Sequence, residues 1–251
     1  LGSKVIELST SPDGININDE CGSTNPENIQ KAVLENKADL GIAFDGDGDR
    51  LLFIDKEGKE LDGDDLLYIL VSANQSRNNS ETYQGIVGTL MSNKSLELFL
   101  HKQGVDFYRT DVGDKYVLRE LIKRNLILGG EPSGHIICLD STTTGDALIA
   151  SLKVLEATRE LNFDLSKALL DFKKLPQELI SLKVNDPQRV IMDSRIRSEV
   201  SKIENKLGKE GRVLLRPSGT EDLIRVMVEA NTEKLAKDLA SELAQFIQQA
   251  A

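Results

Sequence analysis

The hexapeptide DGDGDR, which begins at Asp45 directly after an apolar run, combines residue types that bind metal ions. Its carboxylates, Asp45, Asp47 and Asp49, alternate with glycines, so their oxygens can gather around one hard cation such as Mg²⁺. An EF-hand loop also begins with alternating acidic residues, but it requires glycine at its sixth position and glutamate at its twelfth. Those positions hold Arg50 and Lys56. The motif therefore predicts a divalent-cation site that is not a calcium sensor.

Arg50 bears on the alternative that this segment is only a solvated acidic turn. A cation beside metal ligands is useful when a further anion, such as phosphate, is brought to the same place. A metal ion together with an arginine is typical of phosphoryl transfer. We therefore interpret Arg50 as a contact to a phosphoryl group.

A second loop, GGEPSGH, lies between two apolar runs and presents Glu131, Ser133 and His135. Hydrogen-bond acceptors and donors of this kind suit the vicinal hydroxyls of a sugar. His135 is one of two histidines in the chain, and an imidazole can transfer protons near neutral pH. An ordinary tight turn remains the alternative for this motif.

A third loop, RPSGT, combines a guanidinium, two hydroxyls and a glycine whose N–H is open to a ligand, which predicts a phosphate site. Its candidate ligands are Arg216, Ser218, Gly219 and Thr220. Arg225 follows on the next strand, where odd-numbered residues share one face, so its side chain can approach the same anion. The even-numbered apolar residues of that strand would face the core. A polar hairpin turn is the alternative.

Composition narrows the function classes. The 251 residues carry a formal net charge of −10, with 41 acidic and 31 basic side chains, which disfavours nucleic-acid binding. No apolar run reaches the roughly 20 residues needed to span a bilayer, so we expect a soluble cytoplasmic protein without a membrane partner. Cys21 and Cys138 lack metal-ligand spacing and are expected to be buried thiols.

Hydrophobic periodicity predicts three regions along the chain, bounded at 1–57, 58–172 and 177–251. The first is expected to contain a parallel strand–helix–strand unit and a further strand, at 4–8, 25–35 with Asn25 as N-cap, 39–44 and 51–54. The second is expected to be a fuller α/β domain, with helices at 64–75, 93–103, 115–123 and 145–161 and strands at 84–89, 106–109 and 136–139.

The third region has a different pattern. Its predicted strands lie at 179–184, 212–215 and 223–229, and its predicted helices at 194–207 and 233–249. This order indicates a small α+β domain with antiparallel strands. A connecting segment at 161–176, with one further amphipathic turn, separates it from the preceding domain.

The order and spacing of the three loops resemble the α-D-phosphohexomutase superfamily over essentially the whole chain. Within it, the stretches at 112–117, 142–146 and 215–229 are similar to the phosphoglucosamine mutase family. The resemblance implies an α/β fold made of the C-terminal half of the second phosphohexomutase domain and a complete third domain with mixed sheets. It implies a fourth domain with a four-stranded antiparallel sheet and helices on one face.

The resemblance also implies an activity: interconversion of glucosamine 6-phosphate and glucosamine 1-phosphate through a phosphoserine and a bisphosphorylated sugar, in amino-sugar nucleotide and cell-wall precursor synthesis. The three aspartates would bind Mg²⁺ and Arg50 would contact the transferring phosphoryl group. Glu131 and Ser133 would hold sugar hydroxyls, with His135 as a proton donor or acceptor. The residues expected to grip the phosphate that is not reacting are Arg216, Ser218, Gly219, Thr220 and Arg225.

The sequence departs from the family pattern in three places. It contains no T-x-S-H-N-P-like segment, so the phosphoserine and the first domain are missing, and the chain alone is predicted to be inactive. Asp222 stands where the family usually has proline, and Asp111 where many relatives have a basic residue.

Three alternatives remain open at this point. The chain could come from a phosphomannomutase or phosphoglucomutase, or it could be a non-catalytic module that binds sugar phosphates. A metal-dependent phosphatase is disfavoured, because no separate nucleophile accompanies the aspartates.

Overall fold

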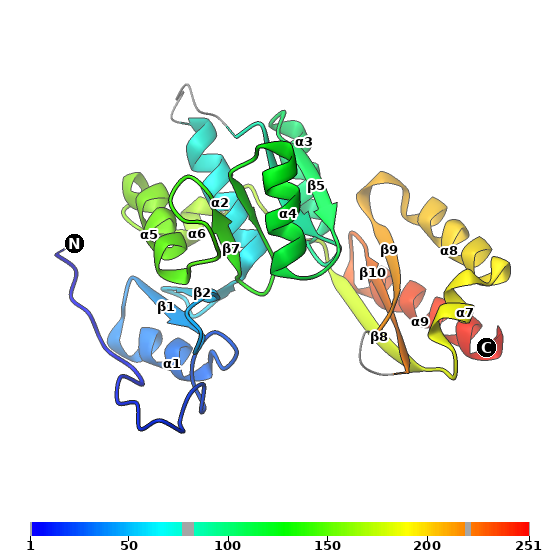
Figure 1. Cartoon of the computed structure of the whole chain (residues 1–251), viewed down its shortest axis with the longest axis horizontal. Helices are drawn as coiled ribbons and strands as arrows, with labels where there is room; N and C mark the ends of the chain where they lie inside the picture. The colour runs from blue at the N-terminus through cyan, green and yellow to red at the C-terminus, as the bar shows by residue number, and fades with distance from the viewer. Residues whose placement is uncertain (1, 77–82, 219–221, 251) are drawn as a thin grey trace. The chain divides into compact units, whose positions relative to one another are not determined.

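Residues 2–76, 83–218 and 222–250 are described by the structure, a computed structural model (Figure 1). Two units are distinguished by their internal contacts. The first unit contains Leu1–Ser92 and Phe99–Phe172, and the second contains Asn93–Leu98 and Lys173–Ala251. Whether residues 1–57 form a separate domain within the first unit stays a prediction.

The first unit begins with a small antiparallel sheet covered by one helix. Its elements are α1 (Glu27–Asn36), β1 (Leu40–Phe44), β2 (Leu51–Asp55) and β3 (Glu60–Leu61), with strand order β1-β2-β3. Val33 of α1 packs against Ala43, Leu52 and Ile54, all of which are buried. The turn between β1 and β2, which carries the DGDGDR motif, therefore lies at one end of this hairpin.

Three predictions for this region are wrong. Residues 4–8 form no strand, because an apolar run becomes a strand only where another strand offers backbone partners. The predicted parallel strand–helix–strand unit is therefore absent, because its first strand does not form, and β1 pairs antiparallel with β2. Pro26 occupies the N-cap of α1, and the Asn25 side chain instead donates to the Asn18 carbonyl.

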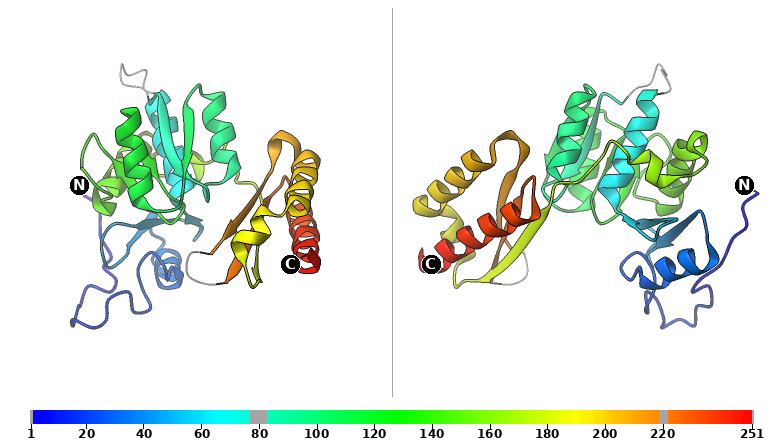
Figure 2. Two further views of the ribbon diagram at one scale, coloured as in Figure 1. Left: turned by 45° about the vertical axis from the view of Figure 1, so that its right-hand side comes forward. Right: turned by 180° about the vertical axis from the view of Figure 1, so that it is seen from behind.

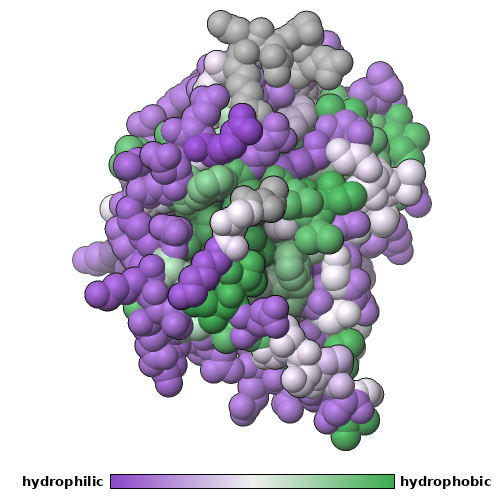
Figure 3. Space-filling view, turned by 90° about the vertical axis from the view of Figure 1, so that its left-hand side faces the viewer, coloured by the Kyte–Doolittle hydropathy of each residue, from purple (hydrophilic) through white to green (hydrophobic). Residues whose placement is uncertain are grey.

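Exposed apolar side chains are found on the segment that precedes α1 and on α5 (Ala147–Thr158). Val5 and Ile15 are 73% and 89% exposed, and Leu148 is 59% exposed. Figure 3 shows hydrophobic surface near the centre of one face of the molecule, bordered by hydrophilic side chains. Contiguous surface of this kind is typical of interaction sites.

A four-stranded mixed sheet forms the larger part of the first unit. Its strands are β4 (Gly85–Thr89), β5 (Asp106–Thr110), β6 (Leu128–Gly130) and β7 (Ile136–Cys138), in the order β5-β4-β6-β7. The first three are parallel neighbours and β7 runs antiparallel to β6. Its helices are α2 (Gly63–Ser76), α3 (Lys94–Lys102), α4 (Asp114–Arg124), α5, the 3₁₀ turn η1 (Arg159–Leu161) and α6 (Leu165–Ala168).

Helices cover both faces of this sheet, as buried parallel strands require. The connection from β4 to β5 contains α3, and the connection from β5 to β6 contains α4. These two connections run in opposite directions across the sheet, so right-handed crossovers place α3 and α4 on opposite faces (Figure 2). Val117 and Leu121 of α4 pack on Val87. Tyr68 of α2 lies 4.3 Å from Phe99 of α3, ring centroid to ring centroid.

The structure refines two predicted boundaries in this region. Gly129 and Gly130 belong to β6 rather than to a turn, and Gly129 approaches β4 so closely that an added Cβ would lie 2.7 Å from the Val87 carbonyl. The predicted helix at 145–161 is shorter, because Asp146 caps α5 by accepting the Ile149 N–H at 2.9 Å.

The second unit is a three-stranded antiparallel sheet with helices packed on one face. Its elements are β8 (Gln177–Lys183), α7 (Pro187–Met192), α8 (Ser194–Leu207), the 3₁₀ turn η2 (Gly208–Glu210), β9 (Arg212–Pro217), β10 (Leu223–Glu229) and α9 (Glu233–Ala250). The strand order is β8-β10-β9. Ile224, Val226 and Val228 are fully buried against helix residues such as Leu243, as predicted, but Met227 and Glu229 of the other face are buried as well.

The expected fourth strand of this sheet is absent from the described residues, which supply three extended segments here. Helix α7 was not predicted, although Asp186 followed by Pro187 is a helix-start signal and Asp186 accepts the Arg189 N–H. Among the described helices, none is long and apolar enough to cross a membrane.

Candidate functional site

The DGDGDR loop is the turn of the β1–β2 hairpin, and Asp45 organises it. Asp45 Oδ1 accepts the N–H groups of Asp49 and Arg50 at 3.2 and 3.1 Å. The Asp45 carbonyl accepts the Gly48 N–H, and the Asp45 N–H donates to the Arg50 carbonyl. Gly48 has φ +68°, a left-handed conformation that glycine adopts without strain. The alternating glycines therefore let the chain fold back within six residues.

The three carboxylates share this loop but do not converge. Asp47 is exposed, and Asp45 and Asp49 are half-buried. In the part of the chain that the structure describes, no three His, Cys, Asp or Glu side chains are gathered closely enough to hold a metal ion. One observation nevertheless fits a cation. Asp49 Oδ1 is buried and has no hydrogen-bond partner among the described residues, and a buried carboxylate oxygen is costly unless something satisfies it.

The GGEPSGH loop is the turn between β6 and β7. It is closed by the Glu131 N–H donating to the His135 carbonyl at 2.9 Å and by the Gly134 N–H donating to the Glu131 carbonyl at 3.0 Å. Ser133 is exposed at its tip. Glu131 is 7% exposed and accepts the Gly113 N–H at 2.9 Å, which ties the loop to the start of α4.

The fold brings the DGDGDR and GGEPSGH loops together. The Leu51 N–H donates to the Gly134 carbonyl at 3.2 Å, and Arg50 and His135 form an isolated antiparallel bridge. The imidazole of His135 lies with Nδ1 3.0 Å from Asp49 Oδ2. Both loops were predicted to be functional from the sequence, but no sequence signal indicated that His135 would contact a residue of the DGDGDR loop.

The structure adds a third segment to this site, residues 145–147, for which the sequence predicted no role. The Ala147 N–H, at the start of α5, donates to the Gly48 carbonyl at 3.0 Å. Gly145 lies against the His135 ring, where an added Cβ would meet Nε2 at 2.2 Å. A glycine just before a helix N-cap was the available signal, since close approach to another group is one reason for glycine.

The RPSGT motif begins in the second unit, at the end of β9. Arg216 of β9 pairs with Arg225 of β10, which in turn pairs with Ser181 of β8, so the three residues form one row on the face opposite the helices. The Ser218 N–H donates to the Leu223 carbonyl at 2.8 Å. Gly219 and Thr220 lie outside the described residues.

The two arginines of this row are like charges held side by side. Burial, and next the charge of Arg225, lower the pKa of Arg216 below its ordinary value. Within residues 2–76, 83–218 and 222–250, neither arginine forms an ion pair with a carboxylate. A bound anion would satisfy both guanidinium groups.

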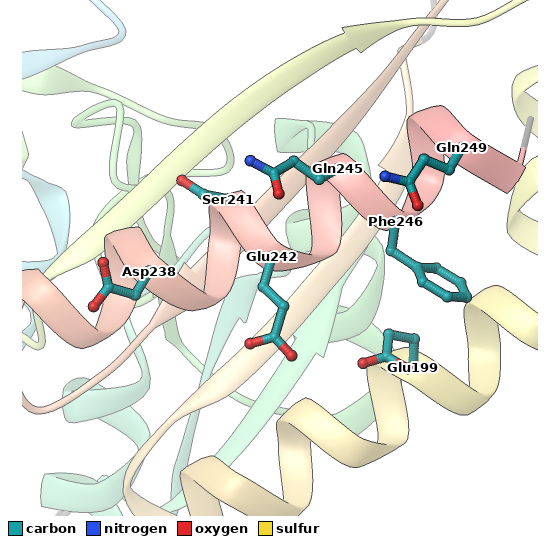
Figure 4. Close-up of a pocket in the computed structure, with 7 residues that line it drawn as sticks. All are labelled: Glu199, Asp238, Ser241, Glu242, Gln245, Phe246 and Gln249. Atoms are coloured by element: carbon teal, nitrogen blue, oxygen red, sulfur yellow. The ribbon is translucent and has the colours of Figure 1, made fainter.

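One surface hollow lies elsewhere in the second unit and holds none of the candidate residues. It measures about 480 Å³, between α8 and α9. Figure 4 shows Glu242 and Phe246 of α9 pointing toward α8, where Glu199 lies. The remaining lining residues are Asp238, Ser241, Gln245 and Gln249. Acidic and amide groups without a cation do not suit a sugar phosphate.

Comparison with protein families matches three models in succession. Residues 1–58 match "Phosphoglucomutase/phosphomannomutase, alpha/beta/alpha domain II" and residues 62–175 match "alpha/beta/alpha domain III" of the same family. Residues 179–246 match its "C-terminal domain". The three matches follow one another in the order of the domain numbers.

Curated relatives match over the whole chain. A phosphoglucosamine mutase from Aeromonas hydrophila is 48% identical over 250 residues, which is 100% of this chain and 56% of the relative. One from Acinetobacter baumannii is 49% identical over 98% of this chain and 54% of the relative. One from Alcanivorax borkumensis is 44% identical over 100% and 56%. The chain therefore spans about half the length of the curated relatives it matches.

Solved structures share the fold. Aspergillus fumigatus N-acetylphosphoglucosamine mutase aligns with a TM-score of 0.76 and 22% identity, over 93% of this chain and 53% of that chain. The same protein in complex with GlcNAc-6P and magnesium aligns with a TM-score of 0.74, also at 22% identity, over 93% and 53%. At this identity the likeness shows the fold alone.

Proposed function

Because the chain belongs to the phosphoglucomutase/phosphomannomutase family of α-D-phosphohexomutases, we propose that it carries the metal, sugar and phosphate loops of a phosphoglucosamine mutase. The reaction would interconvert glucosamine 6-phosphate and glucosamine 1-phosphate in the cytoplasm. The observation that carries the proposal is the identity of 44 to 49% to phosphoglucosamine mutases across the chain. The contact between the metal loop and the sugar loop supports it, because two parts of one reaction centre must lie together.

Asp45, Asp47 and Asp49 are the proposed holders of Mg²⁺. Asp49 has an oxygen without a partner among the described residues, and rotation of the Asp45 and Asp47 side chains would be needed to bring them around the same ion. The ion, when bound, would neutralise charge on the phosphoryl group in transfer. Arg50 is exposed and forms no ion pair among the described residues, so its guanidinium is available to a phosphoryl oxygen. We propose that it holds that group beside the metal loop.

The sugar would be oriented by two loops. We propose that Ser133, which is exposed at the tip of its turn, and Glu131, whose carboxylate accepts the Gly113 N–H, form hydrogen bonds with sugar hydroxyls. Arg216 and Arg225, with Ser218, would grip the phosphate that is not reacting, and Gly219 and Thr220 are proposed to join them. Positioning of this kind can supply several kcal/mol of barrier reduction.

The phosphoserine is proposed to come from an N-terminal domain outside the given sequence. A coupled mutase assay tests this with the chain, glucosamine 1-phosphate, Mg²⁺ and a bisphosphate primer, with and without an added fragment that contains the serine. We expect turnover only when the fragment is present. Turnover by the chain alone would contradict the assignment of the serine.

Two further arms of the same assay separate the alternatives. Replacing glucosamine 1-phosphate by glucose or mannose 1-phosphate should give slower turnover. Faster turnover would assign the chain to a phosphoglucomutase or phosphomannomutase instead. Arg50→Ala should abolish turnover in the presence of the fragment. If no condition gives turnover while calorimetry still detects binding of glucosamine 6-phosphate, the chain would be a sugar-phosphate binding module.

A further inference from the structure

His135 faces the metal loop rather than an open surface. Its side chain is 4% exposed, whereas Ser133, two residues earlier, is exposed. Nδ1 lies 3.0 Å from Asp49 Oδ2, and Nε2 is buried without a hydrogen-bond partner among the described residues. A group that exchanges protons with a bound sugar must reach it, and neither ring nitrogen is presented to solvent in the first unit.

We propose that His135 is a positioning residue, whose Nδ1–H holds the Asp49 carboxylate in the orientation that offers Oδ1 to the cation. An ionised carboxylate can only accept, so the nitrogen facing Asp49 is the donor. With Oδ2 held, the free oxygen is Oδ1, which is the buried atom that lacks a partner. This inference rests on the metal role within the proposed function and on no other part of it.

The ring is held from its other side by Gly145. An added Cβ there would lie 2.2 Å from Nε2, 2.3 Å from Cε1 and 2.9 Å from Cδ2, so no side chain fits without displacing the imidazole. Gly145 also bridges to Ile137 of β7. His135 is therefore packed between Gly145 and Asp49, with its own backbone paired to Arg50.

This arrangement explains why both ring nitrogens are withdrawn from solvent. A hydrogen bond to an ionised carboxylate is stronger than one between neutral groups and fixes its geometry. Groups that orient a metal ligand from behind typically change metal affinity by about 10-fold to 100-fold when they are removed. His135 should therefore affect cation binding before any sugar is present.

The test measures Mn²⁺ and Mg²⁺ binding to the chain by calorimetry, with the Mn²⁺ electron paramagnetic resonance spectrum as a second readout. His135→Leu removes the donor and should weaken binding about 10-fold to 100-fold. His135→Asn keeps an N–H donor close to the position of Nδ1 and should restore most of the affinity. His101→Asn, at an exposed position on α3, is the matched control and should bind like the original chain.

Gly145→Ala gives an independent arm, because it displaces the imidazole while leaving both His135 and Asp49 in the chain. It should weaken Mn²⁺ binding as His135→Leu does, and circular dichroism would establish that each variant is folded. Unchanged affinity in folded His135→Leu or Gly145→Ala would overturn the proposal. So would an original chain that binds no cation.

Activity in the presence of the serine-containing fragment separates this inference from the proposed function. If His135 exchanged protons with the sugar, His135→Asn would lose turnover while keeping full metal affinity, and that result would also contradict the positioning role. A chain whose Mn²⁺ affinity depends on Asp49 and on His135 behind it, but which never turns over, would support this inference and contradict the proposed mutase activity.

Discussion

Arg216 and Arg225, proposed to bind phosphate, show how a residue placed for binding would oppose folding. The two guanidinium groups project from directly paired positions of β9 and β10, and the described residues offer them no carboxylate. Like charges in such cross-strand pairs destabilise a sheet by roughly 0.2–1 kcal/mol. The phosphate that we propose to bind there would offset this repulsion.

Replacing Arg225 by glutamine should have effects of opposite sign on stability and on binding. Arg225→Gln removes the repulsion, so the chain should melt at a slightly higher temperature in phosphate-free buffer. Inorganic phosphate should then raise the melting temperature of the variant less than that of the original chain, because a bidentate contact is lost. Equal stabilisation of both proteins by phosphate would show that Arg225 is not a phosphate ligand.

Gly134 illustrates a second residue-scale constraint, the close approach of two backbones. It has φ +89°, and an added Cβ would lie 2.0 Å from the Leu51 carbonyl oxygen. Gly104 has φ +71° with nothing within 4 Å of an added Cβ, so it isolates the cost of the left-handed backbone alone. The two glycines form a matched pair.

Gly104→Ala should cost about 1–2 kcal/mol of unfolding free energy. Gly134→Ala should cost clearly more, because the methyl group forces apart the loops that carry Asp49 and His135. Urea unfolding followed by circular dichroism measures both values. Equal losses of unfolding free energy in the two variants would mean that the two loops can move apart without an energetic cost.

At the scale of elements, an aspartate caps the start of several helices, among them α5, α7 and α8. Asp193 caps α8 by accepting the Arg195 N–H at 2.8 Å, and the Arg195 guanidinium binds both of its oxygens. The side-chain hydrogen bond from Arg195, followed by the backbone N–H, lowers the pKa of Asp193 from 3.8 to about 2. A carboxyl whose pKa is lower in the folded state stabilises the fold above its unfolded value and loses that effect as the pH falls.

Asp193→Asn should therefore melt at a slightly lower temperature than the original chain at pH 7. Asparagine still caps a helix, so the difference reports the charge. It should shrink below about pH 4 and vanish near pH 2, where Asp193 becomes protonated in the folded state. Because the pair is exposed, the shift should be a few degrees at most. A difference that does not depend on pH would contradict this account.

The positions of the strands and helices could be predicted from the sequence, whereas the pairing of the strands could not. The strand and helix positions around Asp45, Glu131 and Arg216 follow the hydrophobic period, which local residues set. The parallel unit of strands at 4–8 and 39–44 was predicted wrongly, because residues 4–8 form no strand and β1 pairs instead with β2. Pairing depends on which backbone groups lie alongside, and no local pattern contains that information.

At the scale of the whole molecule, the two units have separate apolar cores. Ile224 lies in the core of the second unit and is fully buried, whereas Leu179, on the opposite face of the same sheet, is 45% exposed. A chain with two cores is expected to depart from two-state unfolding. Calorimetry should resolve two transitions.

Ile224→Ala should lower only one of these transitions, by about 2–5 kcal/mol of unfolding free energy. Leu179→Ala, with its exposed side chain, should change either transition by about 0.5 kcal/mol or less. A single transition that moves as a whole with Ile224→Ala would show that the two units unfold together.

The sequence by itself determined the family, the three loops and the chemistry available to each, because these depend on residue types at short spacing. Tertiary structure decided what the side chains contact. His135 and Asp49 are 86 positions apart, and Gly145 becomes meaningful only once the imidazole lies against it. Hydrogen-bond partners and burial are set by segments distant in the chain. The residue type of His135 predicted a role in proton transfer. Its contacts, which only the tertiary structure decides, support the positioning role that we propose instead.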